Sequence, residues 1–120
     1  MTKIYAIKEN HLFGRAYAKG ERCATKNIVV YALKNFKTNQ TRLGITTSKK
    51  IGKAVQRNRA RRLIREAWRH TLENVEFNRP YLVVIVARGA ATEKNRSMGE
   101  VRSDLEKALH TLRLVREKEH

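Results

Sequence analysis

The chain has 120 residues, with 27 Lys and Arg against 11 Asp and Glu, so its formal net charge is +16 and its isoelectric point is near 10.7. This length favours one domain with a modest core, and a hydrophobic content of 41% excludes disorder along the whole chain. The longest apolar run, Tyr81–Ala87, is too short to cross a bilayer, and the single cysteine, Cys23, excludes an intramolecular disulfide.

The positive charge indicates nucleic acid, or another anionic surface, as the partner. The first ten residues lack the long apolar run of a signal peptide, and a single cysteine is compatible with a reducing compartment. We therefore expect a cytoplasmic protein that acts without a membrane and without a small-molecule substrate.

The N-terminal part of the chain predicts one short helix. Residues 1–9 are expected to be extended, and Asn10 is expected to cap a helix over 11–19 that stops at Gly20. The inner face of this helix would carry four apolar or aromatic residues: Leu12, Phe13, Ala16 and Tyr17. A short extra strand is possible near 22–25.

Two strands follow. Asn27–Leu33 is rich in β-branched and aromatic residues, and 42–48 alternates in polarity, so both predict strands; the polar run 34–41 predicts a hairpin loop between them. One face of the second strand carries only small residues: Gly44, Thr46 and Ser48. With Tyr31 nearby, that face could accept a flat or extended ligand. Equally, the small residues could make room for a packing helix.

The most basic stretch, Lys49–Arg69, predicts an amphipathic helix over 55–72 that is preceded by a loop over 49–54. Its apolar arc consists of Ala60, Leu63, Ile64, Ala67 and Trp68. Four arginines follow one another at a spacing of four residues, and two more widen the charged arc: Arg57, Arg61, Arg65, Arg69, Arg59 and Arg62. Like charges at this spacing destabilise a helix. A bound polyanion would relieve that repulsion, although a solvated basic surface is the alternative.

The C-terminal part predicts one buried strand and one helix. The strand is Tyr81–Ala87, which is apolar throughout and so is expected to be covered on both faces. After a loop over 88–95, Ser97 and Glu100 form a capping-box pattern that begins the last helix. Its core stripe is predicted to include Met98, Val101, Leu105, Ala108, Leu109, Leu112 and Val115.

A strand, a long helix and a second strand imply a βαβ unit with parallel strands. The whole order, αβββαβα with the possible extra strand, predicts an α+β sandwich around one mixed four-stranded sheet. We expect a single domain over 1–120, with flexible ends at 1–8 and 117–120.

The sequence offers no catalytic centre and no metal site. Its four histidines fall singly, without the spacing of metal ligands: His11, His70, His110 and His120. No glycine-rich phosphate loop is present. What remains is a basic surface with aromatic residues, which favours RNA recognition through phosphate contacts and base stacking.

An ordered set of motifs resembles the bacterial ribonuclease P protein family. The central part is 42–45 leading into 48–55 and then 57–67, with the RNR signature at Arg57, Asn58 and Arg59. The flanks agree, because Phe13 and 17–20 resemble the family's aromatic first helix, and 83–88 with Ala90 and Ala91 resembles its last strand and loop. The resemblance covers about residues 10 to 112.

This resemblance implies a compact α–β sandwich with a left-handed βαβ crossover, against the usual right-handed rule. It also implies a protein that pairs with a catalytic RNA to remove the 5′ leader from precursor tRNA. In such a complex the RNA performs the Mg²⁺-dependent hydrolysis, and the protein helps to bind the leader and the metal ions.

Carried over by position, the residues expected to face the catalytic RNA are Arg57, Asn58, Arg59, Arg61, Arg62, Arg65 and Arg69. Those expected to line or flank the leader cleft are Phe13, Tyr17, Tyr31, Thr46, Ser48, Lys49, Lys50 and Lys53. Thr47 stands where the family commonly has valine, and Ile28 and Val29 stand near positions that are often aromatic. Two alternatives are a structural RNA-binding protein of the ribosomal type without a leader cleft, and a DNA-binding or nucleoid protein.

Overall fold

The computed structural model describes residues 3–119, and its centre is a four-stranded sheet. The strands are β1 (Glu21–Ala24), β2 (Ile28–Lys34), β3 (Arg42–Thr46) and β5 (Tyr81–Ala87), in the order β1-β2-β5-β3. β1 and β2 are antiparallel, as are β2 and β5, whereas β3 and β5 are parallel. The predicted parallel βαβ unit and the possible extra strand are therefore confirmed.

The predicted hairpin between β2 and β3 is wrong, because β5 lies between these two strands. β5 is the most apolar strand, and six of its seven residues are buried. A central position covers both of its faces and pairs both of its edges, which is where such a strand is most stable.

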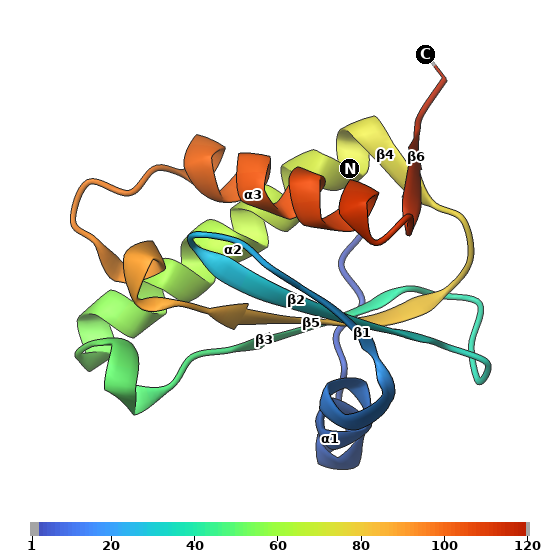
Figure 1. The fold of residues 1–120 in the computed structure, drawn as a ribbon, viewed down its shortest axis with the longest axis horizontal. Coiled ribbons are helices and arrows are strands. Elements are labelled where there is room, and N and C mark those ends of the chain that lie inside the picture. Colours follow the sequence, from blue (N-terminus) through green and yellow to red (C-terminus); the bar gives the residue numbers. More distant parts are fainter. Residues whose placement is uncertain (1–2, 120) are drawn as a thin grey trace.

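Helices cover both faces of the sheet. Figure 1 shows α1 (Asn10–Lys19) on one side and both α2 (Ala54–Asn74) and α3 (Met98–Thr111) on the other. The α+β sandwich is thus confirmed, while the hand of the crossover stays a prediction. Short 3₁₀ turns, η1 (Lys49–Ile51) and η2 (Gly89–Thr92), precede α2 and follow β5.

The helix ends agree in part with the predictions. Gly20 ends α1, and its N–H donates to the Ala16 carbonyl at 2.9 Å. Ser97 and Glu100 form the predicted capping box of α3. Asn10, however, is already helical; Glu9 takes the cap position, and its side chain makes no capping hydrogen bond.

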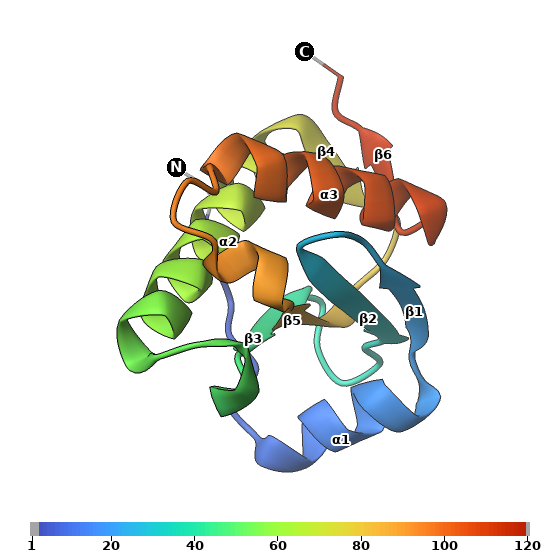
Figure 2. The same ribbon diagram turned by 60° about the vertical axis from the view of Figure 1, so that its left-hand side comes forward.

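A second, two-stranded sheet pairs β4 (Val75–Phe77) with β6 (Val115–Glu117), and both Figure 1 and Figure 2 show it near the C-terminal end of the chain. The predicted last helix was too long, because α3 ends at Thr111 and Arg113 reverses the chain at φ 59°. Val115 is buried in β6 instead of extending a helical stripe. Backbone pairing continues beyond β6 to a hydrogen bond between Lys118 N–H and the Asn74 carbonyl, while the expected flexibility of 117–120 stays a prediction.

The buried face of α2 follows the predicted arc with one exception. Its fully covered residues are Ala60, Ile64, Ala67, Trp68 and Thr71, while Leu63 is only partly buried. Trp68 lies 5.5 Å from Phe77, measured between ring centroids, so it joins α2 to the β4–β6 sheet. This cluster and the sheet face that bears α2 and α3 form the main core.

The opposite sheet face packs against α1, and there Gly44 makes room for Phe13. A Cβ placed on Gly44 would stand 2.5 Å from Phe13 Cε1, far inside van der Waals contact. Of the two interpretations of the small residues on this strand, the packing-helix interpretation therefore holds at Gly44.

We predict that Gly44→Ala lowers the free energy of unfolding by about 1–3 kcal/mol, because Phe13 must move from a packed position. Gly14→Ala is the matched control on α1, where an added Cβ meets nothing within 4 Å. That change should stabilise the helix by about 0.5–1 kcal/mol. Urea denaturation of both variants measures the difference, and equal unfolding midpoints would contradict this account of α1 packing.

Candidate nucleic-acid interface

The outer face of α2 presents exposed cations to solvent. Asn58, Arg61, Arg62 and Arg65 are all exposed there. Within residues 3–119, Arg62 and Arg65 form no ion pair with a carboxylate. Arg61 donates to Thr47 Oγ1 at 2.8 Å, which links this face to the residue that follows β3. The arrangement suits phosphate, since guanidinium groups bind its oxygens in a planar fork.

Of the other three arginines of α2, two are engaged within the protein and the third is partly buried. Arg59 donates from Nη1 to the Glu93 carbonyl at 2.7 Å and from Nη2 to the Arg96 carbonyl at 2.9 Å. Arg69 pairs with Glu66 on the same helix, and Arg57 is partly buried with an unpartnered Nε. Arg59 was expected to widen the charged arc and to face the RNA; the loop after η2 lies against α2 and offers it backbone carbonyls, so this side chain also has a structural role, and its contact with RNA stays a prediction.

Arg96 completes this loop. Its guanidinium donates to Glu100 at 2.8 Å and to Glu93 at 2.6 Å, and its Nε donates to the Ala90 carbonyl. The hydrogen bond from Arg96 holds the pKa of the Glu100 carboxyl below its ordinary value. Because folding lowers the pKa of the Glu100 carboxyl, this group stabilises the fold at pH values above the ordinary carboxyl pKa. The contribution is lost as the pH falls through the lowered pKa.

We predict that Arg59→Ala lowers the free energy of unfolding by about 1–3 kcal/mol, because the variant cannot form the two charge-assisted hydrogen bonds to the loop. Arg62→Ala, on the exposed face of the same helix, should change it by about 0.5 kcal/mol or less. Urea denaturation of the pair tests the assignment. If the two variants have the same stability, Arg59 is not a structural residue.

A cluster of aromatic residues lies on the sheet face that bears α1. Tyr17 is 40% exposed and packs edge-on against Tyr31, with ring centroids 4.9 Å apart. Its hydroxyl lies 3.2 Å from Thr46 Oγ1. Thr46 pairs with Val86, which in turn pairs with Val29, and all three are only partly buried. We call Tyr17, Tyr31, Thr46, Val29 and Val86 the aromatic platform; its exposed ring suits a stacked base.

The remaining leader-cleft candidates divide into two groups. Phe13 is partly buried over Gly44, so it serves packing and is less available than Tyr17. The polar candidates Ser48, Lys49, Lys50 and Lys53 are exposed between β3 and α2. Ser48 Oγ accepts from Lys50 N–H at 3.1 Å, and Gln56 Oε1 accepts from Lys53 N–H at 2.8 Å, so the segment has a defined shape.

The platform and the basic face meet at the end of β3. Thr46 contacts Tyr17, and the next residue, Thr47, contacts Arg61 of α2. No pattern in the sequence indicated this junction, because Thr47 stood out only as a departure from the family pattern. It places an aromatic surface and a cationic surface side by side.

Neither a metal-binding cluster nor a membrane-spanning helix occurs in the described part of the chain. Across residues 3–119, no three His, Cys, Asp or Glu side chains gather into a group that could hold a metal ion. No helix in this range combines the length and hydropathy needed to cross a bilayer.

Comparison with known proteins agrees with the motifs. The family model for ribonuclease P matches residues 1–113. The ribonuclease P protein component of Listeria welshimeri is 38% identical over 118 residues, which is 98% of this chain and 96% of the relative. The same component of Staphylococcus epidermidis is 36% identical, and each chain is covered to 98%.

Solved structures give the same result. The Staphylococcus aureus RNase P protein aligns with a TM-score of 0.77 and 33% identity, over 93% of this chain and 98% of that one. The Thermotoga maritima RNase P protein aligns with a TM-score of 0.72 and 25% identity, over 85% of this chain and 92% of that one. The chain therefore belongs to the ribonuclease P protein family, whose members are the protein part of an RNA-based endoribonuclease.

Proposed function

We propose that the two adjoining surfaces bind two different RNAs. The outer face of α2 binds the catalytic RNA, mainly through Asn58, Arg61, Arg62 and Arg65. The aromatic platform and the lysines after β3 bind the unpaired 5′ leader of precursor tRNA. The junction at Thr46 and Thr47 carries this proposal, because it lets one subunit hold both strands at a fixed separation.

Phosphate and stacking contacts have separate tasks in this arrangement. Cations on a rigid helix fix the position of the RNA backbone without reading its sequence, and they suit a folded RNA that is recognised by shape. An exposed tyrosine can stack on any base, which suits a leader of varied sequence. Hydrolysis and the Mg²⁺ that it requires are proposed to belong to the assembled ribonucleoprotein.

Reconstitution tests this function directly. The protein is combined with a bacterial ribonuclease P RNA at low magnesium, and cleavage of precursor tRNA is followed with leaders of increasing length. We expect the folded protein to stimulate cleavage and affinity to rise with leader length until the platform is filled. A folded protein that gives no stimulation would refute the subunit role, whereas stimulation independent of leader length would refute the platform alone.

A further inference from the structure

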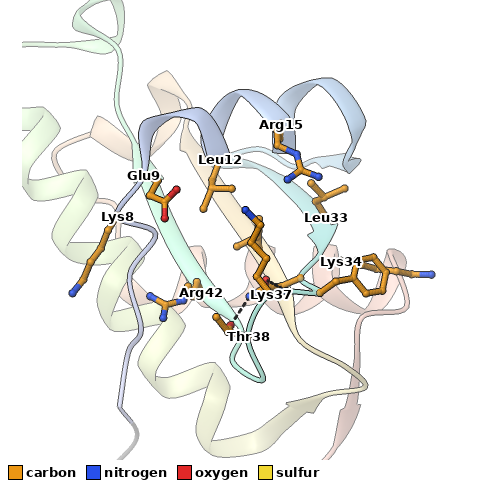
Figure 3. Close-up of a pocket in the computed structure, with 12 residues that line it drawn as sticks. Lys8, Glu9, Leu12, Arg15, Leu33, Lys34, Lys37, Thr38 and Arg42 are labelled. Carbon is orange, nitrogen blue, oxygen red and sulfur yellow. Dashed lines mark hydrogen bonds between the residues drawn. The ribbon is translucent and has the colours of Figure 1, made fainter.

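A cavity lies on the other side of α1 from the aromatic platform. The sheet face under α1 has three rows of paired residues: Val29–Val86–Thr46, Tyr31–Val84–Gly44 and Leu33–Leu82–Arg42. The first row and Tyr31 belong to the platform, and Gly44 of the middle row lies under Phe13. The cavity opens over this third row and has a volume of about 440 Å³ (Figure 3). It is thus separated from the platform by α1 itself.

The lining of the cavity is strongly cationic. Its charged residues are Lys8, Arg15, Lys34, Lys37 and Arg42, with Glu9 as the one carboxylate among them. Arg42 is held in place, since Nη1 donates to the Ala6 carbonyl at 3.0 Å and Nη2 to Gln40 Oε1 at 3.3 Å. Figure 3 shows Arg15 extending from α1 on one side and Arg42 across from it. Leu12, Leu33 and Leu82 provide an apolar floor.

The loop at the mouth of the cavity holds an exposed aromatic ring. Phe36 is 85% exposed, yet it lies in a loop that is ordered by the buried side chain of Asn35. Asn35 Nδ2 donates to Thr38 Oγ1 at 2.8 Å and to the Gln40 carbonyl at 2.9 Å, and its Oδ1 accepts from Lys37 N–H. The loop therefore keeps its shape without burying Phe36, which leaves the ring free to contact a ligand.

We propose that this cavity binds a nucleotide, with the base against Phe36 and the apolar floor and the phosphate among Arg15, Lys37 and Arg42. Base stacking and phosphate binding are the two contacts that a nucleotide offers. Here a loop that Asn35 ties together by hydrogen bonds places an aromatic ring beside a cation cluster with little opposing charge. The nucleotide is either free or an unpaired residue of an RNA strand. The site is independent of the α2 face and the platform.

Amide chemical shifts of the full-length protein provide the test. The labelled protein is titrated with adenosine monophosphate, with a five-residue oligoadenylate and with inorganic phosphate. We expect shifts at residues 34–38 and around Arg42 with at least one adenine ligand, and smaller ones with phosphate. Binding to the monophosphate supports a free nucleotide, whereas binding to the oligonucleotide alone supports a strand.

Variants connect those shifts to the site. Phe36→Ala should weaken adenine binding at residues 34–38 by about fivefold or more, and Lys37→Glu should weaken it as well. Neither changes the Asn35 side chain that orders the loop. Lys107→Glu, an exposed lysine on α3, is the charge-matched control.

Three results would overturn the proposal. The first is equal response to phosphate and adenine ligands, which indicates an anion site without base recognition. The second is an absence of shifts at residues 34–38, and the third is binding that Phe36→Ala leaves unchanged in a folded variant.

Discussion

Replacing Trp68 with alanine is expected to lower the free energy of unfolding by about 3–5 kcal/mol. Trp68 is 2% exposed, lies on the inner face of α2 and packs against Phe77 of β4. Removing the indole leaves a cavity where α2 meets both the main core and the β4–β6 sheet. Domains of this size are stable by about 5–15 kcal/mol in total, so the loss approaches the limit of folding.

Urea denaturation measures this change, and Leu63→Ala on the same helix is its control. Leu63 is only partly buried, so its truncation should destabilise the fold less than that of Trp68. Saturating RNA should restore part of the lost stability, because a ligand that binds only the folded state stabilises it by mass action. A Trp68→Ala variant as stable as Leu63→Ala would show that the inner face of α2 is wrongly assigned.

Helical periodicity predicts which residues of a helix face the core, but it does not predict how completely each of them is buried. The spacing of apolar residues placed Trp68 and Leu63 on one arc, and it correctly identified α2 as amphipathic. It could not rank them, because burial depends on which part of the arc meets α3 and the sheet. Thr71 shows the same limit, since a polar residue is fully buried where the arc continues.

Strand pairing was less accessible to sequence analysis than helix formation. The hydrophobic run at β5 predicted a strand covered on both faces, but nothing local indicated that it separates β2 from β3. The β4–β6 pair joins three-residue segments 40 positions apart, as Glu76 and Arg116 illustrate. Segments so short carry no readable period, and their register is set by the end of α2 and the reversal at Arg113.

The interface shows a similar division. A count of arginines predicted a cationic helix, and the exposed side chains of Arg61, Arg62 and Arg65 agree with it. The count could not reveal which arginines the protein uses itself. Arg59 donates hydrogen bonds to loop carbonyls, and Arg69 forms an ion pair with Glu66. The first contact depends on tertiary packing and the second on local side-chain rotamers. An arginine that matches the family motif is therefore not necessarily free to bind RNA.

Changing Arg65 to glutamate is expected to weaken binding of the catalytic RNA about tenfold or more while slightly stabilising the free protein. One charge-assisted phosphate contact contributes about 1.5–3 kcal/mol, and a reversed charge also repels the backbone. In the free protein, Arg65 stands four residues from both Arg61 and Arg69. Glutamate there replaces two like-charge pairs with opposite-charge pairs, each worth about 0.2–0.5 kcal/mol.

Two measurements on the same variant test this expectation. RNA affinity is measured over a range of salt concentrations, and the slope of log affinity against log salt should decrease by about one for each phosphate that the variant no longer neutralises. Urea denaturation of the free protein should show an equal or higher midpoint. Lys107→Glu on α3 has the same change in net charge and controls for long-range attraction.

The opposite signs of the two effects distinguish a binding residue from a structural one. A residue that supports the fold loses stability and affinity together when it is changed, as expected for Arg59 with its loop contacts. Arg65 is exposed and makes no ion pair within the described residues, so its own charge adds repulsion to α2 that no carboxylate partner of Arg65 offsets. If Arg65→Glu instead destabilises the free protein, or binds RNA as tightly as Lys107→Glu, the outer face of α2 does not hold the RNA.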